Sequence, residues 1–237
     1  MRVMSVIAFV FLLAPGIILA DFTLLDADFD DKTVDFPIGL GGADSGEPLD
    51  VDSGMAATVR YMPFASPCLE IKRTHEGAIS AMFFEFADGA SINVGNVTIS
   101  FDVILHNLDS FNIIDVCEQG YWSSPFCNIF TSTTGSIHLV DAAGYHGIIG
   151  SFLPGQIYNF QIIFDMFAGT YDVLLDGTLI VEDRSHGKTG VGIGRQVFSL
   201  GYSSLVGSGY CIDNLKVMSD EQITADISSF SELKLTF

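Results

Sequence analysis

The chain has 237 residues and is strongly acidic, with 10 Lys and Arg against 29 Asp and Glu and a net charge of −19 at neutral pH. Such a surface repels phosphate backbones and anionic headgroups, which disfavours nucleic acid and anionic lipid as partners. The chain also holds 20 Phe and 24 Gly, a composition that favours strands joined by tight turns.

The first twenty residues have the pattern of a secretory signal peptide. Arg2 precedes an apolar run over residues 6–13, a break follows at Pro15, and the small Ala20 stands before Asp21. The apolar run is shorter than the roughly 20 residues that a membrane-spanning helix needs, and no second long run follows it. We therefore predict a signal peptide over residues 1–20, no membrane insertion, and a secreted protein, or a periplasmic one in a bacterial host.

Residues 21–218 are predicted to form one all-β domain. Between Leu25 and Asp30 apolar and acidic side chains alternate, which is typical of a half-buried strand with a carboxylate face. Residues 39–54 form a polar, glycine-rich loop. The runs that follow, each bounded by turn residues, predict strands over 56–61, 68–73, 78–86, 97–105, 111–116, 136–140 and 157–166.

The clearest hairpin follows these strands. Apolar runs over 170–175 and 178–181 flank Asp176-Gly177, a pair that favours the two-residue turn with positive φ at both positions. Strands over 191–200 and 210–217 complete the domain, and the tail over 219–237 begins with a capping pattern that predicts one short helix. At least ten short strands with almost no helix predict a two-sheet antiparallel sandwich of the jelly-roll type.

Four cysteines follow the predicted signal: Cys68, Cys117, Cys127 and Cys211. In an exported protein disulfides are the default state of such residues. Three pairings are possible, and we favour Cys117–Cys127 with Cys68–Cys211 because the first pair flanks a single loop. The sequence disfavours a zinc site, because it holds no CxxC spacing and its five histidines are scattered and expected at surface or turn positions.

Three segments resemble concanavalin A-like jelly-roll domains of the laminin G and MAM type. They are the opening 28–31 (Asp-Phe-Asp-Asp), the hairpin 169–177 and the closing 210–217. The resemblance spans most of the predicted mature chain and rests on short motifs, so it supports the fold more than any activity. It implies that the first and last strands run side by side.

The same resemblance implies a structural calcium ion held between those two strands. Asp28 and Asp30 match the opening position and Asp213 matches the closing one. Calcium takes several oxygen ligands, which two strands and a loop carbonyl can supply. The alternative is a solvated acidic strand face, with Asp213 capping a turn.

The loop between Cys117 and Cys127 carries the only tryptophan of the chain. Tyr121, Trp122 and Phe126 are predicted as ligand-binding residues, because rigid aromatic side chains at a loop tip stack on sugars or anchor a protein partner. The alternative is that Trp122 folds back over one end of the sandwich.

Catalysis has a weaker signature. A glycosidase needs two carboxyl groups about 5–9.5 Å apart, and the ExDxxE spacing of glucanases with this fold is absent. We therefore expect no catalytic residues and interpret the chain as a secreted, non-catalytic module that binds a glycan or an extracellular protein. The alternatives are a carbohydrate-active hydrolase or lyase that pairs Glu85 with Asp102 or Asp172, and a structural surface or matrix protein.

Overall fold

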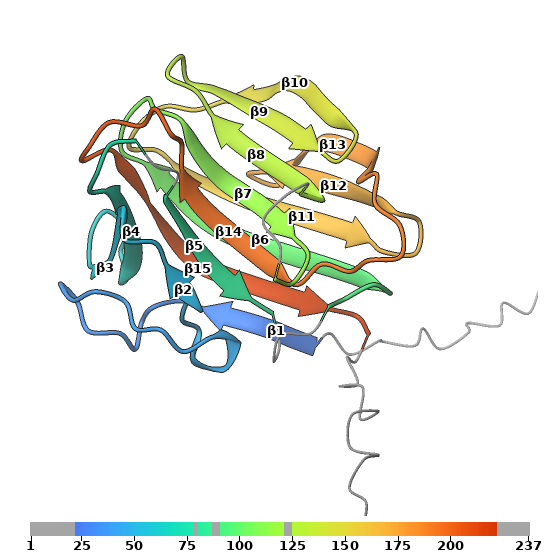
Figure 1. The fold of residues 1–237 in the computed structure, drawn as a ribbon, viewed down its shortest axis with the longest axis horizontal. Helices are drawn as coiled ribbons and strands as arrows, with labels where there is room; N and C mark the ends of the chain where they lie inside the picture. The colour runs from blue at the N-terminus through green and yellow to red at the C-terminus, as the bar shows by residue number, and fades with distance from the viewer. Residues whose placement is uncertain (1–21, 78–79, 87–90, 121–124, 222–237) are drawn as a thin grey trace, which may run out of the picture.

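The protein is a sandwich of two antiparallel sheets, as predicted. The computed structural model describes residues 22–77, 80–86, 91–120 and 125–221. Figure 1 looks onto the seven-stranded sheet, with the eight-stranded sheet behind it. Among the described residues the one helical element is the short 3-10 helix η1, Ala43–Ser45, and no helix is long and apolar enough to cross a membrane.

The seven-stranded sheet has the order β10-β9-β8-β7-β14-β5-β2. Its strands are β2 (Asp50–Val51), β5 (Ser80–Glu85), β7 (Phe111–Cys117), β8 (Cys127–Thr131), β9 (Ser136–Asp141), β10 (Gly144–Ser151) and β14 (Arg195–Leu200). Consecutive strands β7 to β10 pair as a meander, whereas β14 and β5 come from distant parts of the chain.

The eight-stranded sheet has the order β13-β12-β11-β6-β15-β4-β3, and β1 also pairs with β15. Its strands are β1 (Phe22–Ala27), β3 (Met55–Arg60), β4 (Cys68–Arg73), β6 (Asn96–Leu105), β11 (Ile157–Asp165), β12 (Thr170–Leu175), β13 (Thr178–Ser185) and β15 (Gly209–Ser219). The first half of the long β15 pairs with β4 and its second half with β1. The first and last strands therefore lie side by side, as the resemblance implied.

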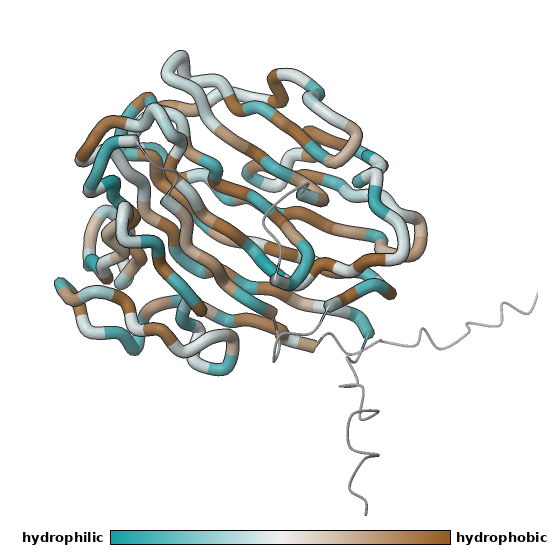
Figure 2. The backbone as a smooth tube through the Cα atoms, in the orientation of Figure 1, coloured by the Kyte–Doolittle hydropathy of each residue, from teal (hydrophilic) through white to brown (hydrophobic). Residues whose placement is uncertain are grey.

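The core lies between the two sheets. Hydrophobic and hydrophilic residues follow one another along many strands of both layers (Figure 2), and successive side chains of a strand point to opposite faces. Phe101 and Phe160 of one sheet meet Phe198 and Phe84 of the other, with the rings of Phe101 and Phe198 in edge contact at 5.3 Å between centroids. Most of the buried apolar side chains of both sheets belong to this one core.

The strand predictions miss three strands, of which β2 lies within the loop predicted over 39–54. β8 and β10 were not predicted, because β8 directly follows the cysteine-bounded loop and β10 contains Gly144, Gly147 and Gly150, which weaken a strand pattern. The predicted hairpin turn is confirmed: Asp176 and Gly177 have φ of 51° and 73°. The predicted signal over 1–20 and tail helix within 219–237 fall outside the described residues, apart from the end of β15 at Ser219 and the two residues after it.

Candidate functional site

The outward face of the seven-stranded sheet carries a row of side chains that crosses four strands. The strand register places His138 of β9 opposite Phe130 of β8, Phe130 opposite Asn112 of β7, and Asn112 opposite Ser199 of β14. The neighbours of these residues along each strand, such as Ile137 and Leu139, belong to the core. The row is therefore on the surface side of the sheet, since side chains alternate between the two faces.

An imidazole and a phenol meet at one end of this row. His138 Nδ1 and Tyr145 Oη are 2.8 Å apart, across the β9–β10 hairpin. The Tyr145 side chain is 61% exposed, so both groups face solvent rather than the core. The imidazole ring stacks on Phe130 with 4.9 Å between centroids and 10° between planes, which fixes its orientation. A fixed imidazole that shares a proton with a phenol can take up one proton and deliver another.

The hairpin that carries this pair is anchored from the opposite side by a buried carboxylate. Asp141, 3% exposed, accepts hydrogen bonds from the backbone N–H of Ala143 at 2.8 Å and from Tyr171 Oη at 3.1 Å, and it pairs with His146 Nε2 at 2.7 Å and Arg184 Nε at 3.3 Å. Burial alone would raise the pKa of Asp141, but the hydrogen bonds from His146, Ala143 and Tyr171 bring this pKa below its ordinary value. The network ties β9 and β10 to β12 and β13 of the other sheet.

A second polar group lies at another part of the same face. Arg195 of β14 forms an ion pair with Glu85 of β5, in which Nε and Oε1 are 2.9 Å apart, and its guanidinium lies over the ring of Phe83. On β7, Asp115 accepts a hydrogen bond from the thiol of Cys117 at 3.2 Å. Burial, together with the charge of Asp115, raises the pKa of Cys117, so this thiol stays protonated and is no nucleophile.

The pairs of acids weighed for a glycosidase do not come together. Glu85 lies on the outward face of the seven-stranded sheet, while Asp102 on β6 and Asp172 on β12 lie on the outward face of the other sheet. The core separates them. Asp102 is instead held by the amides of Asn159 and Asn214, each at 2.8 Å.

The predicted aromatic site is corrected for one of its three residues. Phe126 is fully buried, and its ring contacts Phe164 and His186 while Lys188 Nζ lies 4.9 Å above it. A ring in this position is part of the core and is not available to a ligand. Tyr121 and Trp122 fall outside the described residues.

The predicted disulfides are not formed in this structure, where all four cysteines are free. Cys127 packs in the central core, whereas Cys117 packs with Ala81 and Val197 on the outward side of the same sheet, so the two thiols point to opposite faces. The pairing Cys117–Cys127 is therefore wrong for this fold. Cys68 and Cys211 do lie together, in a small cluster with Phe64 and Ile104.

The predicted calcium ligands lie near one another but are not equivalent. Asp28 and Asp30 line a cavity of about 350 Å³ after β1, where the backbone N–H of Asp30 donates to Asp28 Oδ1 at 3.1 Å. Asp213 is 1% exposed on β15 and accepts hydrogen bonds from Ser66 Oγ at 2.7 Å and from the N–H of Asn214. Burial is the main cause of its raised pKa, and the charges of Asp30 and Asp102 raise the pKa further.

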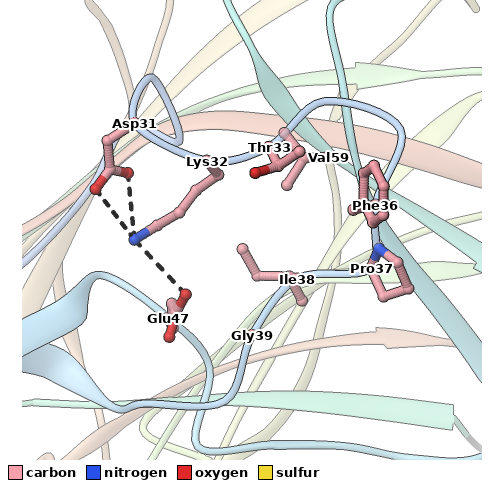
Figure 3. A pocket seen from close by; sticks show the side chains of 9 residues that line it. All are labelled: Asp31, Lys32, Thr33, Phe36, Pro37, Ile38, Gly39, Glu47 and Val59. Carbon is pink, nitrogen blue, oxygen red and sulfur yellow. Dashed lines mark hydrogen bonds and ion pairs between the residues drawn. The ribbon is translucent and has the colours of Figure 1, made fainter.

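A neighbouring cavity of about 510 Å³ lies in the same N-terminal region (Figure 3). Lys32 Nζ extends between Asp31 and Glu47, at 3.2 and 3.6 Å, and donates to the carbonyl of Ser45 at 2.9 Å. The other wall is formed by the apolar side chains of Val59 and Ile38 and by the ring of Phe36. The three charged side chains that line this cavity, Asp31, Lys32 and Glu47, are thus paired with one another.

Sequence reasoning missed the His138–Tyr145 pair. Alternation along 136–140 marks His138 as an outward residue of a strand, and that signal was present. Tyr145 was missed because β10 was missed, and only the hairpin brings the two side chains together. The expectation that the histidines are surface or turn residues is also wrong for His186, which is 2% exposed.

No family model and no curated protein matches the chain. Solved structures do match it. A sialidase matches with a TM-score of 0.57 and 11% identity, over 78% of this chain and 19% of the sialidase. A carbohydrate esterase from the Shiga toxin-encoding bacteriophage phi24B matches with a TM-score of 0.54 and 12% identity, over 85% of this chain and 100% of the esterase. The alginate lyase AlyC3 in complex with dimannuronate also matches, with a TM-score of 0.54 and 10% identity, over 73% of this chain and 80% of the lyase. This chain thus spans about a fifth of the sialidase and most or all of the other two.

At these identities the matches establish the fold, a jelly-roll-like β-sandwich. They do not confirm the finer likeness to laminin G and MAM domains. The expectation of a non-catalytic binding module is corrected, because the matching structures are named as enzymes: sialidase, carbohydrate esterase and alginate lyase.

Proposed function

We propose that the chain is a carbohydrate-active enzyme, and that it is a lyase that cleaves a polysaccharide containing uronic acids by β-elimination. The observation that carries the proposal is the hydrogen-bonded His138–Tyr145 pair on the outward face of the seven-stranded sheet. The fold shared with an alginate lyase supports it at the level of architecture only. If the predicted signal peptide is functional, the reaction takes place outside the cytoplasm.

The chemistry needs one base and one acid. In a uronic acid the C–H bond beside the carboxylate is the acidic one, and its proton goes to His138 Nε2 while Nδ1–H donates to Tyr145 Oη. The electron pair of that C–H bond forms the C=C bond, the glycosidic C–O bond breaks, and the Tyr145 hydroxyl protonates the leaving oxygen. The imidazolium then returns a proton to the phenolate through the 2.8 Å hydrogen bond, which restores the phenol.

Hydrolysis by two carboxylates is less well supported on this face. Glu85 is held by Arg195, and Asp115 is only 6% exposed and bonded to the Cys117 thiol. Neither carboxylate is therefore available to protonate a leaving sugar or to activate a water molecule. Proton transfer through imidazole and phenol fits elimination better.

The test is a turnover screen of the purified chain on uronate polysaccharides, neutral polysaccharides and acetylated sugars. Elimination creates a conjugated C=C bond that absorbs in the ultraviolet, hydrolysis creates reducing ends without that absorbance, and ester cleavage releases acetate. We expect ultraviolet-absorbing product from a uronate polymer. Because the net charge of −19 repels such a polymer, KM should fall as salt rises.

Substitutions at His138 and Tyr145 test the roles of these two residues in the reaction. His138→Ala and Tyr145→Phe should each lower kcat by about 10²–10⁴-fold with an unchanged unfolding curve, because both side chains lie on the surface. His75→Ala, which removes an exposed histidine whose ring nitrogen is bonded to the Thr74 hydroxyl, is the matched control and should keep full activity. Reducing ends without ultraviolet absorbance, or full activity in both site variants, would contradict the proposal.

A further inference from the structure

A second cluster of reactive side chains lies on the opposite outward face, that of the eight-stranded sheet. Cys68 lies on β4, Cys211 on β15, and His106 directly follows β6. Glu70 stands opposite Cys211 in the strand register, and its neighbours Leu69 and Ile71 point into the core. Three adjacent strands therefore direct two thiols, an imidazole and a carboxylate to one place.

The cluster is shielded from solvent and compact. Both thiols are 0% exposed and pack under Phe64. His106 Nε2 is 3.3 Å from Cys211 Sγ, and the ligand atoms of Glu70, His106 and Cys211 all lie within 4.8 Å of one another. Zinc bonds of about 2.3 Å to sulfur and 2.0–2.1 Å to nitrogen in a tetrahedron place the two ligand atoms about 3.6 Å apart, close to the observed separation.

We propose that Cys68, Cys211, His106 and Glu70 bind one zinc ion. Two thiolates, one imidazole and one carboxylate are ligands that zinc takes in four-coordinate sites, and the set is too rich in sulfur for calcium or magnesium. The site is independent of the proposed lyase pair, which lies on the other sheet. Its expected role is structural, because it joins β4, β15 and the end of β6.

The surroundings of the cluster suit a metal. Lys72 Nζ and Arg60 Nε hold the Glu70 carboxylate at 2.7 and 3.1 Å, as ligating carboxylates are usually held by a second set of groups. A zinc ion with two thiolates and one carboxylate carries a net charge of −1, so the positive charges of Lys72 and Arg60 beside Glu70 stabilise it.

The alternative to zinc binding is the disulfide Cys68–Cys211 that the sequence predicts, which uses the same two sulfur atoms. In the register Cys211 stands opposite Glu70 and not opposite Cys68, so the two cysteines are diagonal neighbours. A disulfide would also leave His106 and Glu70 without the role that their placement suggests. The two states exclude each other, because a disulfide consumes both sulfur ligands.

The test uses the mature chain purified from an exporting host, with zinc itself as the probe. After dialysis against metal-free buffer we expect one zinc per chain by elemental analysis. Cobalt exchanged into the site should give the thiolate-to-cobalt charge-transfer band and the intense visible bands of tetrahedral coordination. Cys68→Ser, Cys211→Ser and His106→Ala should each weaken zinc binding by about 10–100-fold or more, measured against a chromophoric chelator.

Cys117→Ser is the matched control, because Cys117 is an equally buried thiol on the other sheet, and it should bind zinc as the wild type does. Near-ultraviolet circular dichroism identifies any variant that has failed to fold, and His106→Ala, at a half-buried side chain, remains informative if a cysteine variant does not fold. An absence of stoichiometric zinc in the wild type, unchanged zinc affinity in His106→Ala, or a Cys68–Cys211 disulfide found by mass spectrometry would overturn the proposal.

Discussion

Asp141 and Asp213 are buried to the same degree, at 3% and 1% exposure, and yet their carboxyl groups respond in opposite ways. Burial acts to raise the pKa of both. Around Asp141, His146, the Ala143 N–H and Tyr171 donate hydrogen bonds, and the net shift of its pKa is downward. Around Asp213, Ser66 and Asn214 donate, but no hydrogen bond offsets its burial fully and two further acids lie nearby, so its pKa is raised.

The difference shows that the partners of a buried carboxylate decide its role. The Asp141 network is complete within the chain and stabilises the hairpin that carries His138 and Tyr145. The Asp213 region holds excess negative charge from Asp30 and Asp102, and the groups that could bind a metal ion there are all carboxylate oxygens. Such a set fits a calcium ion, which would supply the missing positive charge.

The largest expected effect is that of Asp141→Asn. Arg184 and His146 would lose their carboxylate and the buried amide would satisfy fewer donors, so we expect a loss of about 3 kcal/mol in the free energy of unfolding, measured with urea. The wild-type contribution of Asp141 should be complete above its unfolded pKa and be lost as pH falls through its lower folded pKa. The free energy of unfolding of the variant should therefore fall less steeply than that of the wild type as the pH is lowered.

A matched control is Asp176→Asn, at a hairpin turn that accepts Asn as readily as Asp, which should change stability by less than about 0.5 kcal/mol. If Asp141→Asn were as mild as this control, the network would not anchor the hairpin, and the contrast between the two aspartates would lose its structural meaning.

Calcium is the next test, because it should stabilise the region of Asp213 and leave the Asp141 network unchanged. We propose that Asp28, Asp30 and Asp213 contribute to one structural calcium site. Calcium at tenfold above its Kd should stabilise the chain by about 1.4 kcal/mol, because it binds only the folded state. Magnesium at the same concentration is the control for ionic strength, and Asp213→Ala should remove the calcium-specific shift. An equal shift with magnesium, or none at millimolar calcium, would leave a solvated acidic face.

The smallest expected effect is that of Asp213→Asn in chelator. A raised pKa means that the folded state gains stability from Asp213 below its unfolded pKa and loses it as pH rises through the folded pKa. Removing the charge should therefore raise stability at pH 7 by about 1 kcal/mol or less, seen as about 2–4 °C in Tm. The gain should vanish in acid, where the wild-type carboxyl is already protonated. A loss of stability at pH 7 would show that Ser66 and Asn214 compensate the charge.

The hairpin at 170–181 and the long strands were predictable because each depends on a local pattern. Asp176-Gly177 specifies a turn by itself, and alternation specifies which side chains are buried. The candidate site was not predictable in the same way. His138 and Tyr145 are seven residues apart, and their contact depends on a glycine-containing strand that departs from the usual pattern. Likewise, Glu85 and Asp102 looked like partners in the sequence, and only the assignment of β5 and β6 to different sheets separates them.

The sequence by itself therefore determined the fold class and the inward or outward direction of most strand residues, because these follow from periodicity over a few neighbouring residues. The tertiary structure decided which thiols face each other, that Phe126 belongs to the core, and that the imidazole of His138 meets a phenol. The reason is physical: strand pairing and sheet packing join residues far apart in the chain, and a period of two says which face a side chain takes but not which residue stands beside it.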